Sequence, residues 1–345
     1  MARVVCIAPR WLGDALLSRG AMALLGRAGV ELTVLAGPGL GRVFADLPGT
    51  VRVLETPSAT RRARLRAGWR LRHASPDAAL VLPPSWTAAW VAWSTRARVR
   101  LGTRSAGRAV LFTDAIVTPP REVHLSQQYT TLAQRLCAAL GNPAPAPSDP
   151  PPLRARAGEI DAGVARLAAV GIAAGTRPLV VAPGARYGPA KQYPPERFAA
   201  AVRHIHAREG EGPVIVVGAT GDRDAGDAVR RSLPQCVDLV GHTELAELIG
   251  ILAVARGVLA NDSGTMHLAA ALDVPVVGVF GSTNPAWTHP IGSRAAIVHE
   301  PVWCSPCYAP TCAQDFACML RLSPERVADT LLDIPTVPAA GPGPV

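Results

Sequence analysis

Short, almost wholly apolar runs alternate with longer amphipathic segments along most of the chain. In the first half, the runs that we expect to be strands are Val4–Ala8, Glu31–Leu35, Val51–Leu54, Ala78–Leu82 and Ala115–Val117. Helical patterns lie between them, for example Ala15–Ala28 and Leu125–Leu140. Apolar strands separated by helices are typical of a parallel sheet with helices on both faces. The alternation therefore restricts the chain to the α/β class.

A proline-rich stretch at residues 142–152 interrupts this alternation. Proline cannot continue a helix or donate a ladder hydrogen bond, so the stretch predicts a stiff, extended linker. At 345 residues the chain is long enough for two domains, each with its own core. We place one domain at residues 1–145 and the other at 146–335, and we expect 336–345 to form a flexible tail.

The alternation resumes after the linker. The strands predicted there are Leu179–Ala182, Val214–Val217, Val237–Val240, Gly257–Ala260 and Val276–Val279. A last helix is expected from Ser323 to about Leu332, because Ser-Pro-Glu is a typical helix start. Two doubly wound parallel sheets offer ligand sites at the carboxyl ends of their strands. The predicted fold is two doubly wound α/β domains with a cleft between the carboxyl ends of their sheets.

The chain is basic, with 35 Lys and Arg against 26 Asp and Glu and a formal net charge of +9. That balance favours an acidic partner: nucleic acid, nucleotide phosphates or an anionic membrane surface. The N-terminal apolar stretch is too short for a signal peptide, and no run approaches the roughly 18 apolar residues of a membrane span. We therefore expect a cytoplasmic protein whose seven cysteines are mostly reduced.

A glycine turn with a carboxylate, Gly13-Asp14, follows the first predicted strand. In one interpretation Asp14 only caps the next helix, where a carboxylate accepts backbone N–H bonds and suits the helix dipole. In the other it is a general base at the strand end. The spacing by itself leaves both interpretations open.

The loop Pro183–Pro194 follows a buried strand and contains Lys191. This lysine either places an ammonium near a phosphate or is an ordinary exposed side chain. The stretch Asp262–His267 joins another strand to an Ala-rich helix, so its small residues present free N–H groups at a helix start. That stretch predicts an anion site, and the alternative is a plain N-cap.

The first half contains a basic run, residues 61–66, with four arginines. This run could bind nucleic acid, anionic lipid or a phosphorylated sugar, or it could form an ordinary helix face exposed to solvent. Apart from Trp69 it lacks the stacking aromatics of a nucleic-acid site.

Four of the seven cysteines lie close together near the C-terminus: Cys304, Cys307, Cys312 and Cys318. Such a group suggests a structural zinc site or an iron–sulfur cluster, and disulfides or free thiols are the alternatives.

Three motifs, in this order, resemble the ADP-heptose:lipopolysaccharide heptosyltransferases, glycosyltransferase family 9. They are Trp11-Leu12-Gly13-Asp14, the loop Gly184–Pro194 and the segment Asn261–Ala271. The segments Val81–Trp86 and Cys304–Met319 look like the heptosyltransferase II branch. The resemblance extends from about Arg3 to Leu332.

The resemblance implies a GT-B fold, with two Rossmann-like domains, and an inverting transfer of L-glycero-D-manno-heptose from ADP-heptose to the heptosyl-Kdo-lipid A inner core of lipopolysaccharide. It makes Asp14 the catalytic base, and it makes Lys191 the group that neutralises the departing diphosphate. The residues expected at the donor are Gly13, Gly188, Lys191, Gly218, Thr220, Asp222, Asp262, Ser263, Gly264, Thr265 and His267. Those expected at the acceptor are Arg61, Arg64, Ser85, Arg98 and Arg104.

The resemblance also implies that the first domain binds the acceptor, that the second binds the ADP-sugar, and that catalysis needs no cofactor. Because the acceptor is an anionic lipid, we expect peripheral contact with the cytoplasmic face of the inner membrane. We also expect a monomer and no nucleic-acid partner. One open alternative is a related GT-B transferase with another nucleotide sugar or a non-lipopolysaccharide acceptor. Another is a nucleic-acid-binding module built on the cysteine group and the basic run.

Overall fold

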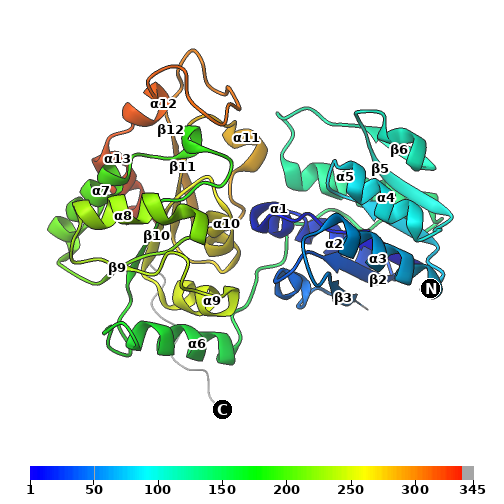
Figure 1. The fold of residues 1–345 in the computed structure, drawn as a ribbon, viewed down its shortest axis with the longest axis horizontal. Coiled ribbons are helices and arrows are strands. Elements are labelled where there is room, and N and C mark those ends of the chain that lie inside the picture. Colours follow the sequence, from blue (N-terminus) through cyan, green and yellow to red (C-terminus); the bar gives the residue numbers. More distant parts are fainter. Residues whose placement is uncertain (50, 336–345) are drawn as a thin grey trace. The chain divides into compact units, whose positions relative to one another are not determined.

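The computed structural model describes residues 1–49 and 51–335. The chain forms two compact units, Met1–Leu153 and a second that begins at Arg154 (Figure 1). The flexible tail expected at 336–345 lies outside the described residues. Among the helices described, none combines the length and the apolarity needed to cross a bilayer.

The first unit is built around a parallel six-stranded sheet with the order β3-β2-β1-β4-β5-β6. Its strands are β1 Arg3–Ile7, β2 Glu31–Ala36, β3 Val51–Glu55, β4 Ala78–Val81, β5 Val99–Arg104 and β6 Asp114–Val117. Its α-helices are α1 Leu12–Leu17, α2 Arg19–Arg27, α3 Arg61–Leu71, α4 Trp86–Ser94 and α5 Leu125–Ala139. The five predicted strands are confirmed. The structure adds β5, whose sequence VRLGTR contains two arginines and a glycine and so lacks an apolar signature.

The second unit contains another parallel six-stranded sheet, with the order β12-β11-β10-β7-β8-β9. Its strands are β7 Leu179–Ala182, β8 Val214–Val216, β9 Val237–Asp238, β10 Gly257–Asn261, β11 Val276–Phe280 and β12 Ala295–His299. Its α-helices are α6 Ala157–Ala168, α7 Pro195–Glu209, α8 Arg223–Ser232, α9 Leu245–Val254, α10 Gly264–Ala271, α11 Pro285–Thr288, α12 Ala317–Leu320 and α13 Pro324–Leu332. The predicted last helix is confirmed as α13, where the Ser323 hydroxyl accepts a hydrogen bond from Arg326 N at 3.2 Å.

The two sheets have the same topology. Counted from its own first strand, each has the order 3-2-1-4-5-6, which is a doubly wound arrangement. In such sheets ligands bind at the carboxyl ends of the strands where the winding reverses. These strands are β1 and β4 in the first unit, and β7 and β10 in the second. The predicted α/β class with two Rossmann-like sheets is therefore confirmed.

Apolar burial fixes the helices on the second sheet. One core cluster joins its strands to Phe198 and Val202 of α7, Val229 of α8, and Val327 and Leu331 of α13. Figure 1 shows α10 on the opposite side of the sheet from α7 and α13. Because helices cover both faces of this sheet, its central strands are continuous apolar runs, and polar residues occur at the strand ends.

The proline-rich segment is held against the first unit beyond residue 145. The fully buried guanidinium of Arg19 donates to Pro151 O at 3.1 Å and to Pro152 O at 3.3 Å, and Leu153 is also buried. Burial lowers the pKa of Arg19 to about 10. These contacts extend the first compact unit to Leu153. Arg19 also opens α2, because the single helix expected over residues 15–28 divides at Ser18.

Candidate functional site

The loop between β7 and α7 is held at both ends by one buried side chain. Asn261, the last residue of β10, donates from Nδ2 to Pro183 O at 2.6 Å and accepts from Tyr193 N at 2.9 Å. Tyr193 is itself buried, and its hydroxyl donates to Leu322 O at 2.8 Å. The Asn261 amide therefore determines where the loop, and Lys191 on it, lies.

Gly188, expected at the donor, has a packing role in this loop. Its φ of +152° lies outside the region that side chains favour, and a Cβ there would collide with Pro310 O. The same carbonyl accepts from Ala190 N at 3.1 Å. The loop therefore lies directly on the segment that contains Pro310, just before the short helical turn with Lys191.

Lys191 reaches the carboxylate at the end of β10. Its Nζ lies 2.5 Å from Asp262 Oδ2, and the two side chains are only 14% and 5% exposed. Thr283 Oγ1 donates to the same oxygen at 2.7 Å. Lys191 is also the only lysine in the chain, which uses arginine for every other permanent side-chain cation. A compact, flexible ammonium is thus present where a cation could exchange a carboxylate partner for a phosphate.

The N-terminus of α10 adjoins this ion pair. Ser263 occupies the N-cap position, but its hydroxyl makes no capping hydrogen bond. The hydroxyl oxygens of Ser263 and Ser282 are buried without a hydrogen-bond partner among the described residues. Gly264 and Thr265 open the helix, and His267 is buried in its first turn. Free N–H groups, the helix dipole and hydroxyls without partners together form a site for an anion.

The loop after β8 joins this edge of the sheet. Gly218 follows the strand, and Thr220–Asp222 form a short 3-10 turn. The Asp222 carboxylate accepts from Ala219 N at 2.9 Å, and a Cβ on Gly184 would collide with it. The donor residues predicted in the second unit therefore share the carboxyl edge of three neighbouring strands, β8, β7 and β10.

Asp14 lies at the carboxyl end of β1, in the first unit. Helix α1 begins at Leu12 with Trp11 as its N-cap, so Asp14 belongs to the first turn and is not the capping residue. Burial, followed by the charge of Asp14, raises the pKa of Tyr129 on α5 well above its usual value. The Asp14 charge therefore acts on Tyr129, and Gly13 directly precedes Asp14 in the first turn of α1.

The five predicted acceptor residues are not all brought together. Ser85 follows β4 and caps α4 by accepting from Ala88 N at 3.2 Å, and Arg104 ends β5. Arg61 and Arg64 lie in the first turn of α3, where burial and then Arg10 lower the pKa of Arg64. Arg98 instead precedes β5, at the amino edge of the sheet. A strand thus separates Arg98 from the other four.

The four clustered cysteines lie in one segment of the second unit. Burial, followed by the other three thiols, raises the pKa of Cys318. Cys312 Sγ accepts hydrogen bonds from Gln314 N and Phe316 N, both at 3.3 Å. Within the described ranges, no group of three or more His, Cys, Asp or Glu side chains is arranged to hold a metal ion.

Sequence reasoning did not select Asn261 and Thr283 as site residues. A polar residue that ends an apolar strand is the signal for Asn261, and the Gly-Ser-Thr run after β11 is the signal for Thr283. Their partners lie tens of residues away in the chain, so only the fold shows what they hold.

Comparisons with known proteins show the family to which the chain belongs. The chain matches the family described as glycosyltransferase family 9 (heptosyltransferase) over residues 64–317. It is 28% identical to lipooligosaccharide heptosyltransferase 2 of Haemophilus ducreyi over 310 residues, which cover 86% of this chain and 88% of that protein.

Solved structures show the same fold. The Escherichia coli ADP-heptose lipopolysaccharide heptosyltransferase II superposes with a TM-score of 0.78 at 24% identity, over 96% of this chain and 98% of that one. The E. coli heptosyltransferase WaaC with ADP gives 0.62 at 20% identity, over 87% and 93%. The two Rossmann-like sheets are thus a GT-B fold, and the family match covers most of the chain. The protein is a glycosyltransferase, and it belongs to glycosyltransferase family 9, the heptosyltransferases.

Proposed function

We propose that this glycosyltransferase transfers L-glycero-D-manno-heptose from ADP-heptose to the heptosyl-Kdo-lipid A inner core of lipopolysaccharide, with inversion at the anomeric carbon. The names of its relatives support this donor and acceptor. The observation that carries the proposal is the buried Lys191–Asp262 pair beside the N-terminus of α10, because a nucleoside diphosphate needs such a site. We assign the donor to the second unit and the acceptor to the first.

On the donor side, the bond from the anomeric carbon to the diphosphate oxygen breaks, and negative charge grows on the leaving ADP. Lys191 neutralises this charge, and the N–H groups of Ser263, Gly264 and Thr265 stabilise it with the helix dipole. Asp262 holds the ammonium in place until the diphosphate arrives. The N–H groups are already in place at the start of α10, whereas the Lys191 ammonium must change its partner from Asp262 to the diphosphate.

On the acceptor side, a sugar hydroxyl is a poor nucleophile until its proton is removed. Asp14 takes that proton as the hydroxyl oxygen forms its bond to the anomeric carbon. Its place in the first turn of α1 favours the ionised carboxylate through the helix dipole. Attack from the face opposite ADP inverts the anomeric centre.

The direct test is transfer of heptose from ADP-heptose to purified heptosyl-Kdo2-lipid A, followed by mass spectrometry. We expect the acceptor to gain the mass of one heptose. A folded protein that binds ADP but transfers nothing would contradict the assigned donor or acceptor. A panel of nucleotide sugars and acceptors then tests the alternative, a related GT-B transferase.

We also propose a cytoplasmic protein that contacts the anionic inner membrane peripherally through the first unit. Arg61, Arg66 and Arg70 are exposed on α3, and Trp69 and Trp93 are each 51% exposed on α3 and α4. Arginine attracts anionic headgroups, and tryptophan suits the membrane interface. Binding to anionic vesicles should weaken as salt rises and in Arg66→Gln, but not in Arg231→Gln of the second unit. Vesicle binding whose affinity does not change with salt concentration would contradict electrostatic docking.

We propose that the four-cysteine segment holds a structural metal, zinc or an iron–sulfur cluster, without a part in catalysis. The close spacing of the four thiols along the chain and the two N–H bonds to Cys312 Sγ support this proposal. The thiols would have to move together around the ion, because no three of them are arranged to hold a metal in the described residues. Metal analysis of the purified protein tests this proposal. Cys312→Ser should lose the metal, and Cys137→Ser, the control, should keep it.

We also expect a monomer that does not bind nucleic acid. Light scattering tests the oligomeric state, and duplex-binding assays test for nucleic-acid binding.

A further inference from the structure

A pocket with a volume of about 570 Å³ opens in the second unit, away from the donor loops. Its lining includes the segments just before β7, β11 and β12, which lie at the amino edge of the sheet. The donor residues lie at the carboxyl edge. At about 3.3 Å per residue, a five-residue strand such as β11 separates the two edges by roughly 15 Å. A ligand in this pocket would therefore leave the donor site free.

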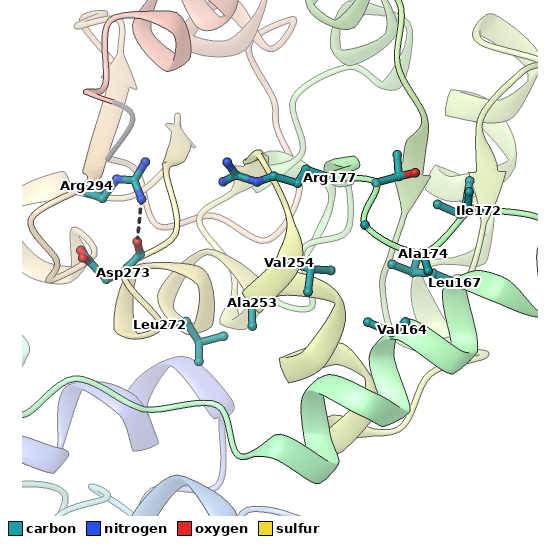
Figure 2. A pocket seen from close by; sticks show the side chains of 13 residues that line it. Val164, Leu167, Ile172, Ala174, Arg177, Ala253, Val254, Leu272, Asp273 and Arg294 are labelled. Carbon is teal, nitrogen blue, oxygen red and sulfur yellow. Dashed lines mark hydrogen bonds between the residues drawn. The ribbon is translucent and has the colours of Figure 1, made fainter. Parts of the chain in front are cut away.

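Two arginines face each other across the pocket. Figure 2 shows the guanidinium groups of Arg177 and Arg294, from two different segments, pointing toward the same space. Neither forms an ion pair with a carboxylate among the described residues. The one carboxylate in the lining, that of Asp273, accepts a hydrogen bond from Ser293 Oγ at 2.7 Å. Two positive charges thus point into one pocket, and no carboxylate of the described residues forms an ion pair with either of them.

Helix capping explains only part of this arrangement. Arg177 Nη2 donates to Ala255 O at the end of α9 at 3.4 Å, and Arg294 Nη1 donates to Asp273 O after α10 at 3.3 Å. Cations are favourable at helix C-termini. However, Nε and Nη2 of Arg294 are buried without an acceptor in the described structure. Buried donors of this kind need a partner, and the caps do not supply one.

The rest of the pocket wall is aliphatic. Val164 and Leu167 of α6, Ile172 after it, Val254 of α9 and Leu272 after α10 supply most of the side chains (Figure 2). Besides the two arginines and Asp273, only Thr176 offers a polar side chain. A sugar or a nucleotide would leave many hydroxyl groups unsatisfied on such a wall. The lining suits a ligand with an aliphatic body and one anionic head.

We propose that this pocket binds an organic anion whose carboxylate or phosphate head lies between Arg177 and Arg294. Its aliphatic body contacts the wall formed by α6, α9 and the end of α10. The head accepts hydrogen bonds from the Arg294 donors that lack a partner, and a planar guanidinium suits either oxyanion. The proposal does not rest on the function proposed for the donor site.

Calorimetry on the full chain with octanoate and octyl phosphate tests the proposal and separates the two head groups. We expect saturable binding of at least one probe at one site. Octanol, which lacks the charge, and inorganic phosphate, which lacks the body, should bind at least about tenfold more weakly. Binding of both controls with equal strength would overturn the proposal.

Variants place the binding in this pocket. We expect Arg294→Gln to lower the affinity for the probe about tenfold or more. Arg177 is exposed, so Arg177→Gln should fold normally and lower the affinity severalfold; it tests the proposal even if Arg294→Gln folds poorly. Arg231→Gln, an exposed arginine on α8, removes the same charge and should bind like the wild type. Lys191→Met should also retain binding. Loss in either of the last two variants, or none in Arg177→Gln, would overturn the proposal.

Discussion

The two sheets of this protein share one topology but differ in the candidate catalytic residue that follows the first strand of each. In the first unit a carboxylate, Asp14, follows β1. In the second unit an ammonium, Lys191, follows β7, which holds the corresponding place in its sheet. The comparison teaches that topology decides where a site forms, and that the residues following the strand decide its chemistry.

The two charges are also held differently. Asp14 lies in the first turn of a helix that starts a few residues after β1, so the helix itself positions the carboxylate. Lys191 lies on a long loop that Asn261 fixes at both ends, and it already has a counter-ion in Asp262. The first site is thus rigid through secondary structure. The second depends on one buried amide, and its cation can exchange partners.

Removing the carboxylate should have the largest effect on activity. We expect Asp14→Asn to lower kcat by roughly 10²–10⁴-fold, the usual contribution of a positioned base, because the acceptor hydroxyl keeps its proton. ADP binding, which we assign to the other unit, should stay unchanged. Steady-state kinetics and ADP titration measure the two quantities. Asp149→Asn, an exposed aspartate of the same unit, serves as the matched control.

Asp14→Asn with near-normal turnover would contradict the assignment of a base. Asp14 would then only stabilise the start of α1, and the two sheets would differ in structure but not in chemistry.

Removing the ammonium should affect donor binding and turnover together. We expect Lys191→Met to lower kcat by about 10²–10³-fold and to weaken ADP binding, because the leaving charge loses its cation. Lys191→Arg should not restore full activity, since a planar guanidinium fits this loop differently. Because Lys191 is the only lysine, an amine-reactive reagent should label it and the N-terminus alone, and ADP should protect it. Unprotected labelling would place the diphosphate elsewhere.

The loop clamp predicts a loss of stability. Asn261→Ala leaves Pro183 O and Tyr193 N buried without partners, which should lower the free energy of unfolding by about 2–4 kcal/mol. The KM for the donor should also rise, because Lys191 loses its fixed position. Denaturant unfolding and kinetics measure both. Asn284→Ala, which removes the N-cap of α11, should cost about 1 kcal/mol and leave the KM unchanged. Equal effects would mean that Asn261 has no special role.

The sequence predicted the strands that carry the site well, because a strand covered on both faces must be apolar. All of β1, β4, β7 and β10 were expected within one residue at each end. The sequence analysis missed β5 and β12. Strand β5 contains two arginines and a glycine, whereas β12 is mostly apolar but is a short, partly exposed strand at the edge of its sheet.

The positions of Asp14, Lys191 and Ser263 at strand ends were also predictable, since glycine turns and helix starts are local patterns. The two hydrogen bonds by which Asn261 holds the loop were not predictable, because its partners are separated from it by about seventy residues of chain. Nor was the buried Arg19, whose acceptors lie in the proline-rich segment. Contacts that close over long stretches of chain leave no local signature.

The smallest predicted effect is a loss of thermal stability in acid that arises from one histidine of the second unit. Burial, followed by the charge of Arg256, lowers the pKa of His206 on α7 of the second unit. The unfolded chain therefore binds a proton more readily below about pH 6.5, so this contribution to stability is complete above that pH and is lost as the pH falls below it. Because the ring is partly exposed, we expect a loss of only roughly 1–2 °C in Tm between pH 7.5 and 5.5. Melting curves of His206→Gln should lack this loss, while those of His242→Gln, an exposed histidine of the same unit, should keep it. If both variants melt like the wild type, the acid response of the second unit comes from other groups.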